Sequence, residues 1–88
     1  MKAINIIVKG RVQGVNFRRY AMERAIMLGI NGFARNLDNG DVEILAEGKE
    51  EKVKEFAKIC RIGPSVAEVK ECVIKDVEVK GYKEFEIL

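Results

Sequence analysis

The order of hydrophobic patterns along the chain constrains its fold more than any other feature of the sequence. Alternating apolar residues indicate a half-buried strand, and apolar residues spaced by three and four indicate a helix with one buried face. The segments follow one another as strand 2–9, helix 17–28, strand 30–36, strand 41–47, helix 48–62, strand 69–79 and a short strand 83–87. The sequence therefore predicts a β-α-β-β-α-β order with one added terminal strand.

Local signals support these boundaries. The expected core-facing stripes are Phe17, Ala21, Ala25 and Leu28 in the first helix and Val53, Phe56, Ala57 and Cys60 in the second. Gly29 and Gly63 are suited to ending the two helices, and the Asn-Gly pair at 39–40 is suited to a hairpin turn. In residues 69–79 the apolar positions change face, which a β-bulge would reconcile.

This order of elements predicts an α+β fold in a single domain, residues 1–88. Two split β-α-β halves form an antiparallel sheet with both helices on one face, and 88 residues leave no room for a second core. Right-handed crossovers place strands 2–9 and 41–47 at the centre of the sheet. The loop after the first strand and the end of strand 30–36 should then meet at one edge.

The balanced charge argues against a nucleic-acid partner. The 16 basic and 14 acidic residues are spread along the chain, whereas nucleic-acid binders usually carry a basic run or patch. RNA binding on the sheet would need aromatic residues on the central strands, and segments 2–9 and 41–47 have none.

No apolar run reaches membrane-spanning length and no signal-peptide pattern is present. We therefore expect a cytoplasmic protein without a membrane partner, and a monomer because no long apolar seam is visible.

The chain has no histidine, and its two cysteines do not cluster with other metal ligands. The sequence therefore lacks the commonest general base and predicts no metal site. Cys60 continues a helical stripe and Cys72 lies in a strand, so we expect two reduced core residues rather than a disulfide. The chain is also rich in Glu and Lys. Such enrichment is a feature of proteins from hot environments, so we expect a host of that kind.

A loop with two glycines joins the first strand to the first helix. Residues 10–18 read Gly-Arg-Val-Gln-Gly-Val-Asn-Phe-Arg. Glycine lets several N–H groups turn toward one point, and a helix start adds unpaired N–H donors. Arg18 adds a planar fork that fits two oxygens of a phosphate or carboxylate. The loop is a candidate phosphoryl cradle. The local pattern alone, however, favours a tight turn followed by helix arginines that are exposed to solvent, and for Arg19 we expect only this solvent-exposed role. A P-loop is excluded because its Gly-Lys-Ser/Thr ending is missing.

A second informative segment, residues 32–36, reads Gly-Phe-Ala-Arg-Asn and ends just before the predicted turn. Asn at such a position often bonds its own backbone in the turn. Because Asn39 and Gly40 already supply the turn, the carboxamide of Asn36 is partly free for another role.

The two segments together resemble the two signature segments of the acylphosphatase family. The sequence GRVQGVNFR and the pattern GFARN-x3-G-x-V-x5-G occur in the family's order and at about its spacing, in a chain of its size. The resemblance implies a ferredoxin-like α/β sandwich. It also implies hydrolysis of small-molecule acyl phosphates to a carboxylate and inorganic phosphate, with neither a metal nor a cofactor.

The resemblance also implies roles for particular residues. Arg18 matches the arginine that binds the phosphate, and Asn36 matches the asparagine that positions the attacking water. The loop amides that match the phosphate cradle are those of Gln13, Gly14, Val15, Asn16 and Phe17. One alternative stays open, because a fold does not determine a function: a non-catalytic module that binds phosphate or carbamoyl phosphate.

Overall fold

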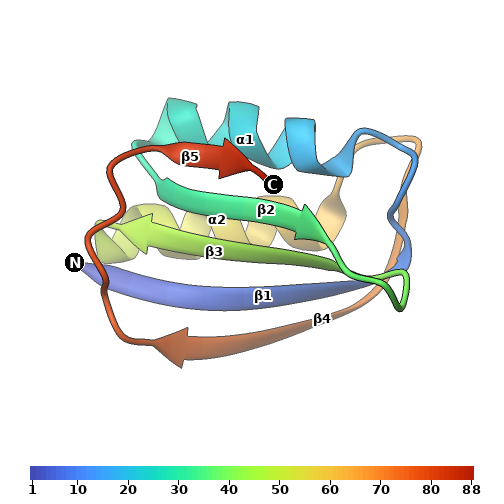
Figure 1. The fold of residues 1–88 in the computed structure, drawn as a ribbon. Helices are drawn as coiled ribbons and strands as arrows, with labels where there is room; N and C mark the ends of the chain where they lie inside the picture. The colour runs from blue at the N-terminus through green and yellow to red at the C-terminus, as the bar shows by residue number, and fades with distance from the viewer.

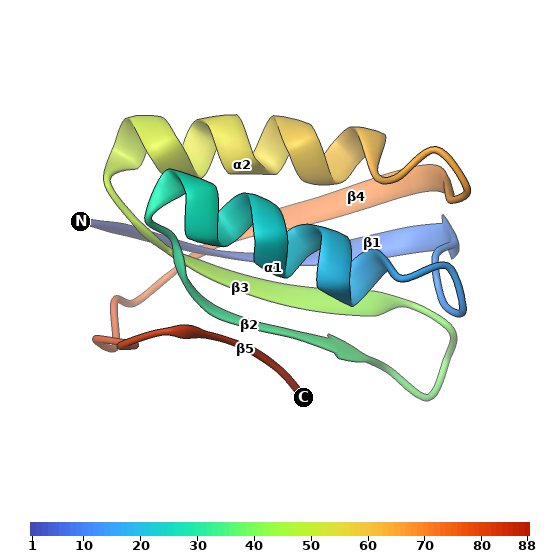
Figure 2. The ribbon, with the colours of Figure 1, turned by 90° about the horizontal axis from the view of Figure 1, so that it is seen from above.

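A computed structural model describes all residues from 1 to 88. Its elements are β1 (Lys2–Arg11), α1 (Phe17–Leu28), β2 (Asn31–Asn36), β3 (Val42–Gly48), α2 (Glu50–Ile62), β4 (Glu68–Val77) and β5 (Phe85–Ile87). The strands form one five-stranded sheet in the order β4-β1-β3-β2-β5. Both helices cover the same face of the sheet, as Figure 1 and Figure 2 show. The predicted α+β architecture is confirmed, with β1 and β3 adjacent in the sheet. Neither helix is long and apolar enough to cross a membrane.

The sheet is mixed rather than antiparallel throughout, which corrects the sequence-based prediction. The β1–β3, β1–β4 and β2–β3 pairs are antiparallel, but β2 and β5 run parallel. The reason is the path of the chain after β4. This strand ends at the edge of the molecule where β2 begins, and residues 78–84 carry the chain along that edge (Figure 1). A strand that starts there runs in the direction of β2.

The helices end where their sequences predict, but α2 begins later than expected. Gly29 ends α1 in a left-handed conformation with φ 70°, and its N–H donates to carbonyls of the last turn. Gly63 follows α2 with a positive φ of 71° but an extended ψ of 178°, and its N–H donates to the Ile59 carbonyl. Gly48 does not open α2, because it stays paired with Lys2 in the β3–β1 ladder. The extended residue Lys49 precedes the helix instead.

The change of face in the fourth strand is a β-bulge, as the pattern predicts. The register shifts between Lys9 and Gly10 of β1, which leaves Lys70 of β4 as the extra residue. The residues of β4 that consequently pack against the core are Val69, Cys72 and Ile74.

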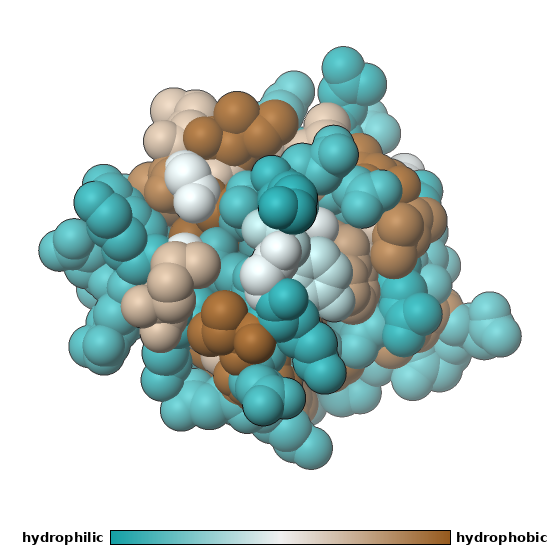
Figure 3. Space-filling model, turned by 60° about the vertical axis from the view of Figure 1, so that its left-hand side comes forward, coloured by the Kyte–Doolittle hydropathy of each residue, from teal (hydrophilic) through white to brown (hydrophobic).

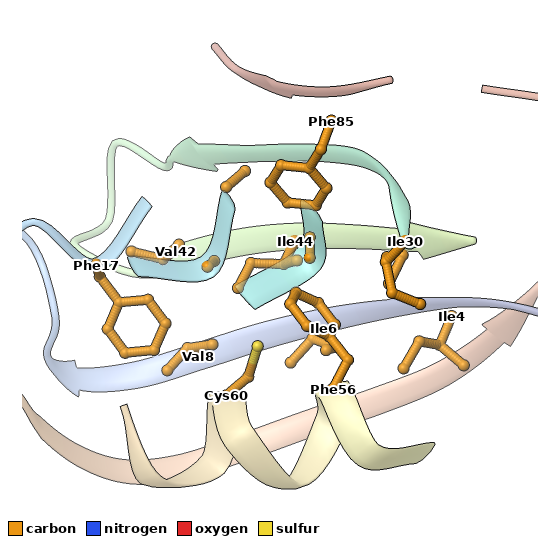
Figure 4. Close-up of a cluster of buried hydrophobic side chains, with 14 of the residues drawn as sticks. Ile4, Ile6, Val8, Phe17, Ile30, Val42, Ile44, Phe56, Cys60 and Phe85 are labelled. Carbon is orange, nitrogen blue, oxygen red and sulfur yellow. The ribbon is translucent and has the colours of Figure 1, made fainter. Parts of the chain in front are cut away.

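The core lies between the sheet and the two helices. Figure 4 shows Phe56 and Cys60 of α2 pointing toward the β1 side chains Ile6 and Val8. The Phe56 ring also meets Phe85 edge-to-face, with 6.1 Å between centroids. This contact ties β5, the shortest strand, to the second helix.

One buried carboxylate holds the segment that connects β4 to β5. Glu47 of β3 is 1% exposed, and its two oxygens accept backbone N–H bonds from Lys80, Gly81 and Tyr82. Asn31 of β2 donates a further bond to the Tyr82 carbonyl at 2.9 Å. Hydrogen bonds to an ionised acceptor are stronger than neutral ones, so Glu47 is the principal anchor of residues 78–84.

Replacing Glu47 with glutamine is therefore expected to lower the free energy of unfolding by about 2 kcal/mol. The amide offers a single oxygen acceptor and turns an NH₂ group toward N–H donors. Urea denaturation followed by circular dichroism measures the change. Glu78→Gln, which changes an exposed carboxylate in the same segment, is the control and should leave the midpoint unchanged. Equal midpoints for the Glu47 variant and the parent would contradict the anchoring role.

Candidate active site

The connection from β1 to α1 and the turn from β2 to β3 lie side by side at one end of the sheet (Figure 1, Figure 2). A cavity of about 340 Å³ opens there, which is near the lower limit for a small-molecule site. Its lining residues are Val12, Gly14, Asn16, Phe17, Arg18, Arg19, Asn36 and Ile87. The predicted meeting of the first loop with the end of β2 is confirmed. Arg18 and Asn36, which are 18 residues apart, line one cavity.

The β1–α1 loop presents N–H groups that no protein atom uses. Gly14 and Asn16 have positive φ angles of 75° and 61°, conformations that let neighbouring N–H groups converge on an anion. Among the backbone hydrogen bonds outside regular ladders, none uses an N–H from residues 13–19. The first such donor after the loop is Tyr20, which bonds the Asn16 carbonyl at 3.0 Å.

The start of α1 also lacks the usual neutralising groups. It has no side-chain cap and no acidic residue in its first turn, whereas α2 begins with Glu50 and Glu51. Unpaired N–H groups and the positive end of the dipole therefore remain open to an external anion. The eight lining residues include two arginines and no carboxylate, so the charge of the cavity favours the same class of ligand.

Arg18 projects from the first turn of α1, and its guanidinium is only partly engaged. One terminal nitrogen, Nη1, donates to the Leu88 main-chain oxygen at 3.0 Å. A guanidinium has five N–H donors, and no other protein acceptor takes one of them. The contact holds the side chain beside the end of β5 and leaves a fork of donors for an oxyanion.

Asn36 ends β2, where its backbone pairs with Val42. The chain has five asparagines, and three of them donate side-chain hydrogen bonds to protein acceptors, namely Asn5, Asn31 and Asn39. The side chains of Asn16 and Asn36 make no such bond, and these two residues line the cavity. The Asn36 carboxamide is thus free to hold a water molecule or a ligand.

Two of the loop residues assigned to the cradle do not line the cavity. Val15 packs against the core, and the Gln13 side chain turns to the β2–β3 turn. Their contribution to a cradle is therefore through main-chain N–H groups alone. Arg19 is an exposed charge, as expected, and lies 3.6 Å from Glu23 in an exposed ion pair, but it also lines the cavity.

Sequence reasoning missed the part of the wall that comes from β5. Ile87 lines the cavity, and Leu88 supplies the oxygen that contacts Arg18. No local signal marks these residues, because only the parallel pairing of β5 with β2 brings them to the site.

Neither cysteine is placed to act as a nucleophile in this cavity. Both are free thiols, Cys60 in the core and Cys72 on β4, at the sheet edge opposite β5. Burial raises the pKa of each thiol above its usual value, so both stay protonated at neutral pH.

The topology and the cavity define a class: a ferredoxin-like α/β sandwich with an open loop of N–H donors beside an arginine. A model of the acylphosphatase family matches residues 4–87. The acylphosphatase of Vibrio parahaemolyticus is 41% identical over 88 residues, covering 100% of this chain and 98% of that protein. The chain belongs to the acylphosphatase family.

Solved structures agree with this assignment. The crystal structure of acylphosphatase from Bacillus subtilis matches with a TM-score of 0.97 at 35% identity, covering 100% of this chain and 99% of the other. Full-length HypF in its phosphate- and nucleotide-bound form matches with a TM-score of 0.89 at 30% identity. The match spans 99% of this chain but 12% of HypF, so this fold also occurs as one part of a much larger protein.

Proposed function

We propose that this protein hydrolyses the carboxyl-phosphate bond of small acyl phosphates, releasing a carboxylate and inorganic phosphate without a metal ion or cofactor. The observation that carries the proposal is the cavity lined by Arg18, Asn36 and the start of α1. Family membership supplies the reaction class. The geometry supports Arg18 and the loop N–H groups as the binding groups.

The phosphoryl group would be held by main-chain N–H groups of residues 13–18 together with Arg18. These N–H groups have no protein acceptor, and Arg18 has donors to spare beyond its bond to Leu88. Hydrogen-bond donors fixed in advance by the fold stabilise the charge on the equatorial oxygens as the phosphoryl group transfers. Arg18 is the binding and catalytic cation in this proposal.

Asn36 would hold the attacking water in line with the leaving oxygen. Its carboxamide both accepts and donates hydrogen bonds, but it cannot take a proton at neutral pH. The water oxygen forms a bond to phosphorus as the bond from phosphorus to the acyl oxygen breaks. A phosphate oxygen of the substrate accepts the proton of the water, so no side-chain base is needed.

The leaving group explains why such a sparse site suffices. An acyl phosphate is a mixed anhydride, and its carboxylate departs without protonation by a strong acid. What remains is positioning and charge stabilisation, the main demands of phosphoryl transfer. In this site Arg18 and the helix N-terminus would carry the charge that a metal carries in other phosphoryl-transfer enzymes.

The alternative is a module that binds phosphate or carbamoyl phosphate without turnover. It is favoured by one observation, the match of this fold to part of HypF. Such a module would use the same loop and Arg18 but would not need a water-positioning carboxamide. The unpaired side chain of Asn36 beside the loop supports the enzyme over the module.

Incubation of the pure protein with benzoyl phosphate, followed by the loss of its absorbance, distinguishes the two functions. We expect multiple turnovers, at the same rate with and without excess EDTA, because the site supplies its own positive charge. Binding of phosphate without turnover would favour the module. Turnover that disappears with EDTA and returns with a divalent cation would contradict the metal-free reaction.

We also propose that residues 1–88 form one domain that acts as a monomer in the cytoplasm, without a nucleic-acid partner. One sheet and one core cluster support the single domain, and two free cysteines suit a reducing compartment. Apolar side chains on the face seen in Figure 3 form separate patches among hydrophilic ones, which supports a monomer. The Glu and Lys enrichment supports a host from a hot environment.

A further inference from the structure

The side chain of Gln13, the only glutamine in the chain, spans from the β1–α1 loop to the β2–β3 turn. Its Nε2 donates to the Leu37 carbonyl at 2.8 Å and to the Asp41 carbonyl at 2.9 Å. Both hydrogens of one amide group are therefore used on the two carbonyls that bracket the turn. Gln13 is half-buried and is followed by Gly14, which lines the cavity, while Leu37 directly follows Asn36.

The turn does not depend on Gln13 for its own shape. Within it, the Leu37 N–H bonds the Asp41 carbonyl at 2.8 Å, and the Gly40 N–H bonds the Leu37 carbonyl at 3.1 Å. The Asp41 N–H in turn bonds the Asn39 side chain at 3.0 Å. Each carbonyl that Gln13 contacts thus has a second partner, so losing the Gln13 bonds leaves neither carbonyl without a donor.

The turn also has a second connection to β1, which bypasses the loop. Lys9 Nζ lies 2.7 Å from Asp41 Oδ2. Lys9 belongs to β1 and does not line the cavity. The turn therefore has two side-chain ties, one from Lys9 of β1 and one from Gln13. Only the Gln13 tie starts from the loop that carries the N–H donors.

We propose that the Gln13 side chain is a positioning residue that fixes the separation between the loop and Asn36. The inference rests on the proposed function, in which the loop holds the phosphoryl group and Asn36 holds the water. In-line attack needs these two to keep one relative position, and small misplacements of reacting groups cost large factors in rate. Gln13 acts on turnover through Asn36 and does not touch the substrate with its side chain.

The first test compares Gln13→Met with Lys9→Met, using benzoyl phosphate as substrate and inorganic phosphate as inhibitor. Gln13→Met keeps the length of the side chain but removes both donors. We expect kcat to fall by about tenfold to hundredfold, while the inhibition constant of phosphate changes by less than about threefold. Lys9→Met removes the other tie and should leave kcat within about twofold of the parent. A Lys9 variant as slow as the Gln13 variant would assign the loss to general loosening of the turn and overturn the proposal.

A double-mutant cycle with Asn36→Ala gives the decisive readout. If Gln13 works by placing Asn36, then Gln13→Met should lower kcat by less than about twofold when Asn36 is already alanine. The same fall in kcat whether residue 36 is asparagine or alanine would overturn the positioning role, and so would an unchanged kcat in the single variant Gln13→Met. Either result would leave the proposed function intact. A parent protein that binds phosphate but shows no turnover would instead refute the proposed function itself.

Discussion

Replacing Arg18 with alanine is expected to lower kcat/KM for an acyl phosphate by about a thousandfold or more. The guanidinium lines the cavity at the positive end of α1, and the Leu88 oxygen occupies a single donor. In the proposed reaction, its loss removes a charged, two-pronged contact to the phosphoryl oxygens in the ground state and in the transition state. Inhibition by inorganic phosphate should weaken along with turnover, which steady-state assays with phosphate as a competitor measure.

Two further substitutions separate this role from general charge effects. Arg18→Lys should restore only part of the activity, because an ammonium offers a point charge rather than a planar fork. Arg24→Ala is the matched control on the same helix, since Arg24 is exposed and stacks on the Tyr20 ring at 4.8 Å. It should keep kcat/KM within about twofold. If the Arg18 and Arg24 variants have the same kcat/KM and the same inhibition constant for phosphate, Arg18 is not the phosphate-binding cation.

The sequence predicts the helices well because each helical signal is local. The stripe that begins at Phe17 and the cap at Gly29 both lie within the segment that they define, and α1 spans the predicted residues. The bulge in β4 is likewise visible as a change of face between Val69 and Cys72. These features depend on near neighbours in the chain, so periodicity suffices to find them.

The parallel pairing of β5 has no local signal. Its direction follows from the path of residues 78–84, which depends on hydrogen bonds that backbone N–H groups 33 to 35 residues further along donate to the carboxylate of Glu47. On the alternating pattern alone, Glu47 reads as a polar, outward-facing strand residue. Long-range hydrogen bonds of this kind leave no mark on periodicity.

The same distinction applies to the site. In the sequence, residue 18 is an arginine at a helix start and residue 36 is an asparagine that the turn does not need, but only the family resemblance implies their roles. Gln13 could be assigned only as a loop amide, because its side-chain partners lie 24 and 28 residues further along the chain. The contribution of Ile87 to the cavity wall depends on the register of β5.

Replacing Asn36 with alanine is expected to lower kcat by about a hundredfold or more while leaving the inhibition constant of phosphate nearly unchanged. In the proposed reaction the carboxamide holds the water and not the phosphoryl group. Its loss should therefore affect the transition state far more than ground-state binding. The contrast with Arg18→Ala, where binding and turnover fall together, makes the pair of variants informative. Steady-state kinetics on the two variants, with phosphate as inhibitor, measures both kcat and the inhibition constant.

Asn31→Ala provides the matched control on the same strand. That carboxamide is bound to the Tyr82 carbonyl at 2.9 Å, so its removal should lower stability by about 1 kcal/mol. Because Asn31 lies at the opposite end of β2 from Asn36, kcat should stay within about twofold. Unfolding curves then measure the stability lost in Asn31→Ala, and steady-state kinetics measures the kcat lost in Asn36→Ala. An Asn36 variant that binds phosphate and turns over at the parent rate would show that Asn36 does not hold the attacking water. Asn16 would then be the remaining lining residue with an unpaired carboxamide.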